Sequence, residues 1–328
     1  MAKAGPISRA IVAMTGVMPR WFVRYISRRY VAGSTLDDAV RVMHRLSDQG
    51  ACFTIDVLGE EITSLEEATF FLEEYRRVMA QILEHGFDAN LSIKPTAFGL
   101  LIDEDVGLDN IRRLVKEAAE HDMFVRLDME DHRVTDATID VVLTLHAEGL
   151  VNVGTVLQGR LHRTLDDIDR IADRLGVAAD HRICKGIYLE PESIAHTSRQ
   201  AITDATVACV VRSLDQGAYV GIATHDDAVI NASLEALSKG GWTPDGDVDP
   251  RDPSPPNRLG KGPGYEFQML LGVRGPLRRG LREQGHRTRV YIPYGEKWYE
   301  YSIRRLKENP TVATQVAKAF LMPWTNRP

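Results

Sequence analysis

The sequence predicts an α/β protein whose strands and helices form a closed (β/α)8 barrel. Eight short, apolar segments of strand length alternate with helical segments along the 328-residue chain. Such alternation requires a parallel sheet with crossover helices, and eight repeats is the number that closes into a barrel. No Gly-x-Gly-x-x-Gly follows the first strand, which disfavours an open doubly wound sheet. We therefore expect a TIM-type barrel with an N-terminal helical extension and a last helix over the barrel mouth.

Three regions are expected: a helical extension over residues 1–50, the barrel over residues 51–309, and a C-terminal tail over residues 310–328. Arginines interrupt the apolar leader of the extension, so it can neither cross a bilayer nor form a clean signal-peptide core. An amphipathic helix that lies on a membrane surface remains an alternative for this leader. The net charge of −6 offers no basic field for nucleic acid. Three distant cysteines without zinc spacing indicate a reducing cytosol and no metal site.

The extension's second helix and the first barrel unit have clear boundary signals. Ser34 is the expected N-cap of that helix, with aspartates in its first turn, and Gly50 ends it. The apolar segment 51–57 is typical of a strand. Ser64 and Glu67 then form a capping box, which starts a helix that runs to about residue 84.

Seven further units follow, each a strand segment and then a helical segment. We expect them at 89–94 with 108–120, 123–128 with 134–146, 151–157 with 165–175, 181–187 with 197–214, 218–223 with 228–237, 265–271 with 276–283, and 287–292 with the last helix. Residues 240–264 interrupt the pattern with six prolines and several glycines, which is typical of a long, mobile loop. A spacer is favoured for this loop over a lid or a partner-docking loop.

Polar side chains stand where the predicted strands end. In a barrel of this type the carboxyl ends of the strands form one rim, where catalytic groups gather. A single residue also has a structural interpretation: Lys94 could pair with Asp128, and His225 could be a hydrogen-bonded core histidine. Eight polar strand ends together favour a functional rim. They are Asp56, Lys94, Asp128, Gln158, Lys185 with Tyr188, Thr224 with His225, Glu266 with Gln268, and Tyr291.

The last helix carries the most specific chemistry. Tyr301, Arg304 and Arg305 are three or four residues apart, so they share one helical face. Two guanidiniums can bind a small carboxylate through paired hydrogen bonds. The alternative is a solvated helix with surface ion pairs, because Glu300 and Glu308 each lie four residues from Arg304.

Seven motifs stand in chain order at these strand ends and on the last helix: Leu91–Lys94, Arg126–Glu130, Thr155–Gln158, Arg182–Glu190, Ala223–His225, Glu266–Gln268 and Tyr301–Arg305. Together they resemble the successive motifs of the proline dehydrogenase family. The resemblance covers about residues 28–309, and Leu189 is similar to the one-domain bacterial type. The sequence departs from the family pattern in the long 240–264 loop and at Pro95, which stiffens the second βα loop and could shift Lys94.

The resemblance implies oxidation of L-proline to Δ1-pyrroline-5-carboxylate, with hydride transfer to FAD and electrons passed to a quinone. No cysteine, histidine or tyrosine stands in a motif for flavin attachment, so we expect the FAD to be bound noncovalently. The resemblance further implies a cytoplasmic enzyme, peripheral at the inner membrane surface where the quinone lies. A separate pyrroline-5-carboxylate dehydrogenase is the expected partner for the product. Catalysis would then rest on orientation of the substrate over the flavin, without a metal or a covalent nucleophile.

The resemblance also assigns roles to individual residues. Asp128 and Arg182 would be catalytic: Asp128 would hold Arg304 or Arg305, and Arg182 would lie near the flavin N5 and stabilise the negative charge of reduced flavin. The substrate-binding residues would be Lys94, Tyr188, Tyr291, Tyr301, Arg304 and Arg305, with the cations on the carboxylate and the tyrosines around the ring. The cofactor-binding residues would be Met129, Gln158, Arg182, Lys185, Gly186, Ile187, Thr224 and His225.

Two other functions remain open on the sequence. A Schiff-base aldolase on the same barrel would use Lys94 or Lys185 as its nucleophile, with the arginines on a phosphate or carboxylate. A catalytically inactive barrel would serve as a binding module. Flavin absorbance in the purified protein would eliminate the aldolase, and an absence of flavin would favour the binding module.

Overall fold

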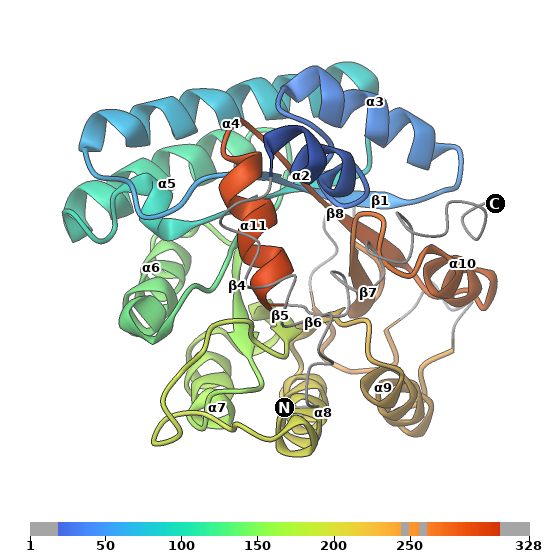
Figure 1. Ribbon diagram of the computed structural model, residues 1–328. Helices are drawn as coiled ribbons and strands as arrows, with labels where there is room; N and C mark the ends of the chain where they lie inside the picture. Colours follow the sequence, from blue (N-terminus) through green and yellow to red (C-terminus); the bar gives the residue numbers. More distant parts are fainter. Residues whose placement is uncertain (1–18, 244–248, 256–260, 309–328) are drawn as a thin grey trace.

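The computed structural model describes residues 19–243, 249–255 and 261–308 and shows a closed barrel of eight parallel strands (Figure 1). Neighbouring strands follow chain order, and β8 closes the ring by pairing with β1. The predicted fold class is therefore confirmed. The strands are β1 (Cys52–Val57), β2 (Ala89–Ile93), β3 (Val125–Leu127), β4 (Val153–Gln158), β5 (Asp180–Cys184), β6 (Tyr219–Ala223), β7 (Tyr265–Leu270) and β8 (Thr288–Tyr294).

Helices surround the barrel because each crossover returns the chain to the start of the next parallel strand (Figure 1). The crossover helices are α4 (Leu65–His85), α5 (Glu104–Ala119), α6 (Thr135–Ala147), α7 (Thr164–Leu175), α8 (Arg199–Asp215), α9 (Asp227–Lys239) and α10 (Gly275–Glu283). Outside this ring are α2 (Arg20–Ser27), α3 (Leu36–Ser47) and α11 (Trp298–Glu308). Three short 3-10 helices complete the described elements: η2 (Pro95–Phe98), η3 (His132–Val134) and η4 (Gly176–Ala178).

Two helix starts differ from the sequence prediction because a neighbouring side chain makes the better cap. The N-cap of α3 is Thr35, not Ser34, and it forms a reciprocal capping box with Asp38. Helix α5 begins at Glu104, four residues before the predicted 108, because the Asp103 carboxylate accepts a hydrogen bond from the backbone N–H of Val106 at 3.1 Å.

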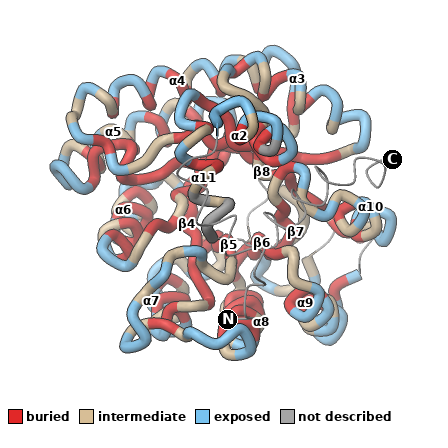
Figure 2. Tube along the Cα trace, in the orientation of Figure 1, coloured by how far each residue is buried: buried red, intermediate tan, exposed pale blue. Residues whose placement is uncertain are grey.

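Burial follows the barrel architecture (Figure 2). The strands are buried almost throughout, because their inner face fills the barrel and their outer face packs under the helices. A separate small apolar cluster joins α2 and the segment after it to α11 through Val23, Tyr30, Val31, Trp298 and Tyr301. Figure 1 shows α11 lying across the centre of the ring with α2 beside it, so the predicted last helix over the mouth is present.

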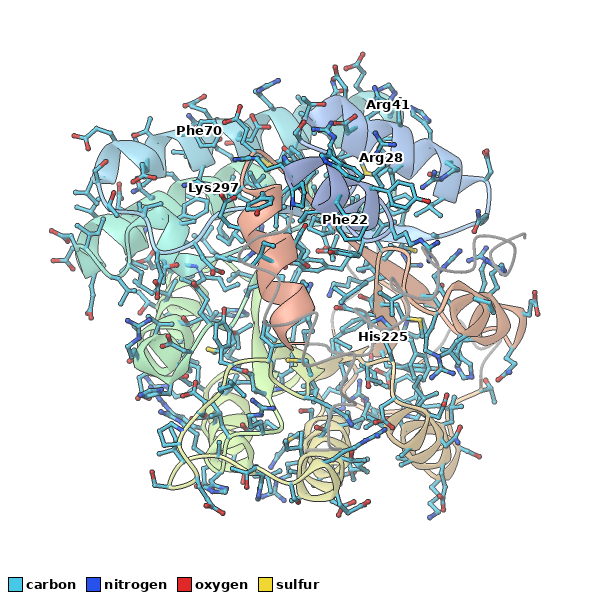
Figure 3. The ribbon with its side chains drawn as sticks, viewed as in Figure 1. Phe22, Arg28, Arg41, Phe70, His225 and Lys297 are labelled. Carbon is cyan, nitrogen blue, oxygen red and sulfur yellow. The ribbon has the colours of Figure 1, made fainter. Side chains whose placement is uncertain are left out.

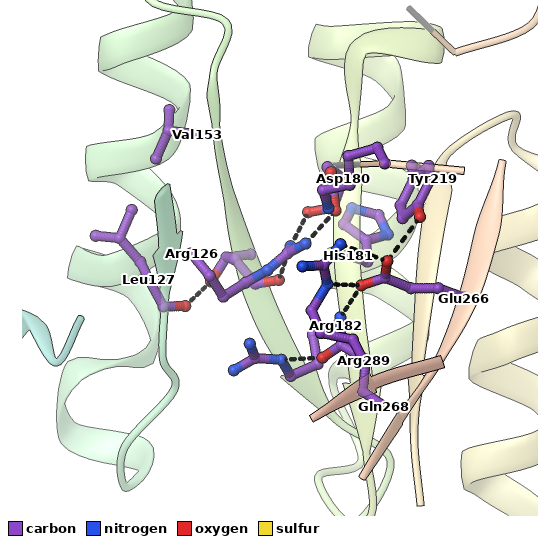
Figure 4. Close-up of polar contacts among 12 residues, drawn as sticks. Arg126, Leu127, Val153, Asp180, His181, Arg182, Tyr219, Glu266, Gln268 and Arg289 are labelled. Carbon is purple, nitrogen blue, oxygen red and sulfur yellow. Dashed lines mark hydrogen bonds and ion pairs between the residues drawn. The ribbon is translucent and has the colours of Figure 1, made fainter. Parts of the chain in front are cut away.

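Inside the barrel, near the starts of the strands, charged side chains form a network (Figure 4). Arg126 donates to the Asp180 carbonyl at 2.7 Å and also pairs with its carboxylate, and Lys261 Nζ lies 2.8 Å from the other oxygen of that carboxylate. The Glu266 carboxylate accepts from Arg289 Nε at 2.6 Å and from Tyr219 at 3.1 Å. Each buried charge thus has an opposite partner, as burial in a low dielectric requires.

The described parts of the 240–264 loop pack at this same end of the barrel. Arg251 stacks on Trp242, with its guanidinium carbon 4.9 Å from the ring centroid, and donates to the carbonyl oxygens of Leu214 and Ala218. The side chain of Lys261 is buried between the rings of Phe124 and Tyr219. These residues precede β7, so they lie opposite the strand-end rim and do not form a lid over it. Among the described helices, none is long and apolar enough to span a membrane.

Candidate active site

The first ion pair of the rim joins Asp56, at the end of β1, to Lys94, directly after β2. Lys94 Nζ lies 2.5 Å from Asp56 Oδ1, and both side chains are buried. Lys94 has the extended backbone that a residue before proline favours, and Pro95 starts η2, so the proline keeps the lysine pointing at its partner. Burial opposes a charge on Lys94, but the carboxylates of Asp56 and Asp128 outweigh it and raise the lysine's pKa. The lysine is therefore an ammonium ion, paired with Asp56 and not with Asp128.

Asp128 is the centre of the rim. Its Oδ1 accepts from Arg182 Nη1 at 2.5 Å and from Ser92 Oγ at 2.6 Å, and its Oδ2 accepts from the Tyr291 hydroxyl at 2.8 Å. Burial alone would raise the pKa of this carboxyl, but the positive charges of Arg182 and Lys94 hold it below the usual value. Four strands, β2, β3, β5 and β8, are thus joined through one ionised carboxylate.

Arg182 is also held from its other side. Its Nε donates to Gln268 Oε1 at 2.5 Å, and Gln268 Nε2 donates to Glu266 Oε1 at 2.6 Å (Figure 4). Glu266 and Gln268 are the second and fourth residues of β7, so they face the interior below the rim and do not end their strand as expected. Gln268 therefore links the rim to the charged network near the strand starts. The guanidinium of Arg182 also lies 5.3 Å from the centre of the Tyr291 ring, which fixes its plane.

A second group lies between the ends of β4 and β5. Gln158 Nε2 donates to the Glu130 carbonyl at 2.8 Å. Gly186 has a φ of +88°, and a Cβ there would lie 2.6 Å from Gln158 Oε1, so glycine suits both this backbone conformation and the close approach of the loop to Gln158. Arg160 donates to the Tyr188 carbonyl, while its buried Nε has no hydrogen-bond partner among the described residues. A positively charged donor without a partner among the described residues suits an anionic ligand such as a dinucleotide.

The remaining predicted cofactor residues make hydrogen bonds to their neighbours. Lys185 Nζ binds Asp226 at 2.7 Å and Thr203 at 2.8 Å, and Thr224 Oγ1 accepts from the Asp226 N–H at 3.1 Å. His225 Nε2 accepts from the Leu270 N–H at 3.0 Å, which requires an unprotonated nitrogen. Burial, followed by the nearby positive charges of two arginines, lowers the His225 pKa to about 4. These contacts agree with the interpretation of His225 as a hydrogen-bonded core histidine.

Helix α11 places its tyrosine and arginine together over the rim. Tyr301 is buried, and its hydroxyl accepts from Arg305 Nε at 3.0 Å. Ser302 and Trp298 are buried as well, so the helix packs on the barrel and is not a solvated helix. The side chain of Arg304 lies outside those that the structure describes. Arg182, from inside the barrel, pairs with Asp128, and the expectation that Asp128 holds Arg304 or Arg305 stays a prediction.

Three other predicted site residues lie on the loops after β3 and β5. Tyr188 is half-buried and Ile187 exposed on the loop after β5, and Met129 packs in an apolar cluster. Several rim residues received no role from the sequence: Asp56, Ser92, Arg160, Asp226 and Gln268. Spacing could have indicated two of them, because Ser92 lies two residues before Lys94, and Gln268 two after Glu266, on the same face of a strand.

Comparisons with known proteins agree on one family. A family model described as proline dehydrogenase matches residues 39–318. Proline dehydrogenase 1 of Bacillus subtilis (strain 168) is 33% identical over 296 residues, and proline dehydrogenase of Deinococcus radiodurans is 34% identical over 300 residues; each alignment covers 90% of both chains.

Larger proteins share the same barrel. The bifunctional protein PutA of Escherichia coli is 22% identical over 334 residues, which cover 88% of this chain and 23% of PutA. The crystal structure of proline utilization A from Bdellovibrio bacteriovorus, inactivated by N-propargylglycine, superposes with a TM-score of 0.76 at 20% identity. That likeness covers 92% of this chain and 34% of the other, and at this identity it shows the fold.

Proposed function

This chain belongs to the proline dehydrogenase family and oxidises proline, and from that premise we propose that its rim binds FAD and proline and releases Δ1-pyrroline-5-carboxylate. The observation that carries the proposal is the buried cluster of Asp128 with Arg182, Ser92 and Tyr291 below α11. Arg182 is the fixed cation of this cluster and Tyr291 its fixed phenol. Both lie where the arginines of α11 would hold the carboxylate of the substrate.

The family is flavin-dependent, and the residues between β4 and β5 fit such a group. Gln158 and Arg182 would meet the isoalloxazine, and the Nε of Arg160, which has no partner among the described residues, would meet the anionic part. When bound, the flavin supplies the acceptor for two electrons and a proton from the substrate. Lys185 and Thr224 would line the cofactor, since both lie on the same rim.

The chain's own residues orient the substrate. Lys94, Arg304 and Arg305 would bind the proline carboxylate, because ammonium and guanidinium donors form short charge-assisted hydrogen bonds with it. Tyr291 and Tyr301 would enclose the ring, and the bond from Arg305 to Tyr301 keeps the phenol and the guanidinium in one orientation. Fixing the substrate in one reactive orientation is the main contribution that such a site makes to the rate.

The aldolase alternative receives no support from the lysines. A Schiff-base lysine needs a neutral amine, which proteins obtain by lowering its pKa. Lys94 is instead paired with Asp56 and has a raised pKa, and Lys185 is paired with Asp226.

Two further parts of the proposal concern what happens after proline is oxidised. The electrons would pass to a quinone, and since quinones dissolve in lipid, the enzyme would work at the inner surface of the membrane. Relatives such as PutA are named bifunctional, and for this chain a separate pyrroline-5-carboxylate dehydrogenase would consume the product.

Purified protein is expected to carry noncovalent FAD, which proline bleaches in the absence of oxygen. The absorbance band near 450 nm should disappear on anaerobic addition of proline, because the two electrons have no other acceptor. Acid precipitation should leave all of the flavin in the supernatant, identified as FAD by chromatography. A colourless protein that does not bind added FAD would refute the proposal, and flavin retained in the pellet would refute its noncovalent part.

Proline is expected to be preferred over trans-4-hydroxyproline by at least about tenfold in kcat/KM. A hydroxyl pressed against the Tyr301 ring without a hydrogen bond costs roughly 1–3 kcal/mol, and 1.4 kcal/mol corresponds to tenfold. Changing Tyr301 to Ser should narrow the preference, whereas Tyr299→Ser, two residues earlier on the same helix, should leave it unchanged. Equal use of both substrates by the unmodified enzyme would remove Tyr301 from the substrate site.

A further inference from the structure

Helix α2 presents an unusual outer face. Arg20, Arg24 and Arg28 are spaced four apart, so they form one stripe, and Trp21 and Tyr25 form a second stripe beside it. Trp21 is 68% exposed and Tyr25 is 60% exposed, although both are large aromatic residues. Arginine and exposed aromatic side chains are the combination found on helices that lie in a membrane interface.

The arginines of this face are not neutralised by the protein. Among the described residues, no carboxylate forms an ion pair with Arg20, Arg24, Arg28 or Arg29, whereas the exposed Arg133 is paired with Glu61. The guanidinium of Arg20 instead lies 4.8 Å from the Tyr299 ring centroid, and that of Arg24 lies 5.6 Å from the Trp298 ring centroid. Because the whole chain has a net charge of −6, this face is a local excess of positive charge on an acidic protein.

A cavity of about 160 Å³ opens beside this face, between α2 and α11. Arg24, Arg28, Ser27 and Trp298 line it. It also contains one carboxylate, Asp38, which accepts from the backbone N–H groups of Ser34 and Thr35 and pairs with Arg41. Figure 3 shows Phe22 on α2, and Arg28 just after that helix, beside α11. Two arginines beside a small cavity suit a phosphate group.

The fold holds this face rigidly at the active-site end. Ala32 N–H donates to the Pro293 carbonyl at 2.9 Å, and Gly295 N–H donates to the Gly33 carbonyl at 3.1 Å, so the segment after α2 is bound to the end of β8. The loop after β5 lies at the same end and exposes 81% of Leu189. Helix α2, which exposes Trp21 and Tyr25, therefore lies at the same end of the barrel as the rim.

We propose that the outer face of α2 docks the enzyme on a membrane of anionic lipids, with Arg24 and Arg28 on the headgroup phosphates and Trp21 and Tyr25 inserted at the interface. The proposal rests on the proposed transfer of electrons to a membrane quinone, and it gives that transfer a surface and an orientation: the mouth of the barrel faces the lipid.

The test is co-sedimentation of the FAD-loaded protein with vesicles of phosphatidylcholine alone or with phosphatidylglycerol added. We expect binding to the anionic vesicles that weakens with salt. The double variant Arg24→Gln/Arg28→Gln should lower the partition coefficient about thirtyfold, from roughly fivefold for each basic residue near an anionic surface. Trp21→Ser/Tyr25→Ser should lower it by at least about tenfold, because the aromatic side chains no longer insert.

Matched controls come from the other end of the barrel. Arg279→Gln/Arg282→Gln removes two exposed charges from α10, and Leu83→Ser/Val151→Ser removes two exposed apolar side chains from the strand-start end. Both controls should bind vesicles as the unmodified protein does. Absence of vesicle binding, equal binding to neutral vesicles, or self-association that depends on Trp21 and Tyr25 would each overturn the proposal. Bleaching of flavin by proline in solution needs no vesicle, so it tests the proposed function separately.

Discussion

Replacing Asp128 with asparagine is expected to lower kcat/KM for proline by about 150- to 4,000-fold. The carboxylate accepts hydrogen bonds from Arg182, Ser92 and Tyr291, and an amide cannot neutralise the buried guanidinium. Removal of one partner of a buried ion pair costs about 3–5 kcal/mol, and each 1.4 kcal/mol lost from the transition state is a factor of ten. Steady-state rates with a soluble electron acceptor, at measured flavin content, give the result.

The control for this prediction is Asp180→Asn. Asp180 is more deeply buried than Asp128 and pairs with Arg126 and Lys261, but it lies at the opposite end of the barrel interior. It should lower the melting temperature as Asp128→Asn does, while the folded enzyme keeps its kcat/KM. An Asp128→Asn enzyme that loses stability but not activity would show that this cluster holds the fold together and takes no part in the reaction.

Replacing Arg305 with methionine is expected to raise KM for proline by about 30- to 150-fold, with the flavin still bound. The lost charge-assisted contact with the substrate carboxylate is worth about 2–3 kcal/mol. The same change at Arg304 should have an effect of the same size, because both side chains come from the helix over the mouth. Anaerobic titration of the flavin absorbance with proline measures the affinity directly.

Lys297→Met is the matched control for these two variants. Lys297 is an exposed cation next to the first residue of α11 and is not part of the proposed clamp. Its replacement therefore removes the same charge without removing a contact to the substrate. Its KM should stay within about twofold of the unmodified value, since surface charges contribute little. If KM were unchanged in both arginine variants, the carboxylate clamp would have to be sought elsewhere on the rim.

Local sequence patterns predicted most of the architecture. Hydrophobic periodicity and turn residues act within a few residues of one another, so they indicate strands and helices without knowledge of the partners. All eight strands and the helix over the mouth were predicted in this way, and errors were confined to ends, such as the cap at Thr35. That Asp128 lies on the rim also followed from the sequence, because a strand's carboxyl end has one location in a barrel.

The sequence by itself determined the repeating units, the closed barrel and the set of polar groups at its mouth. Only the tertiary structure decided which of those groups meet: Asp128 pairs with Arg182, 54 residues away, and Lys94 with Asp56, 38 residues away. Partner choice depends on the strand register and on the height of each side chain inside the barrel, which no local pattern encodes. The tertiary structure also decided the position of α2 beside α11, because packing between segments far apart in the sequence fixes it.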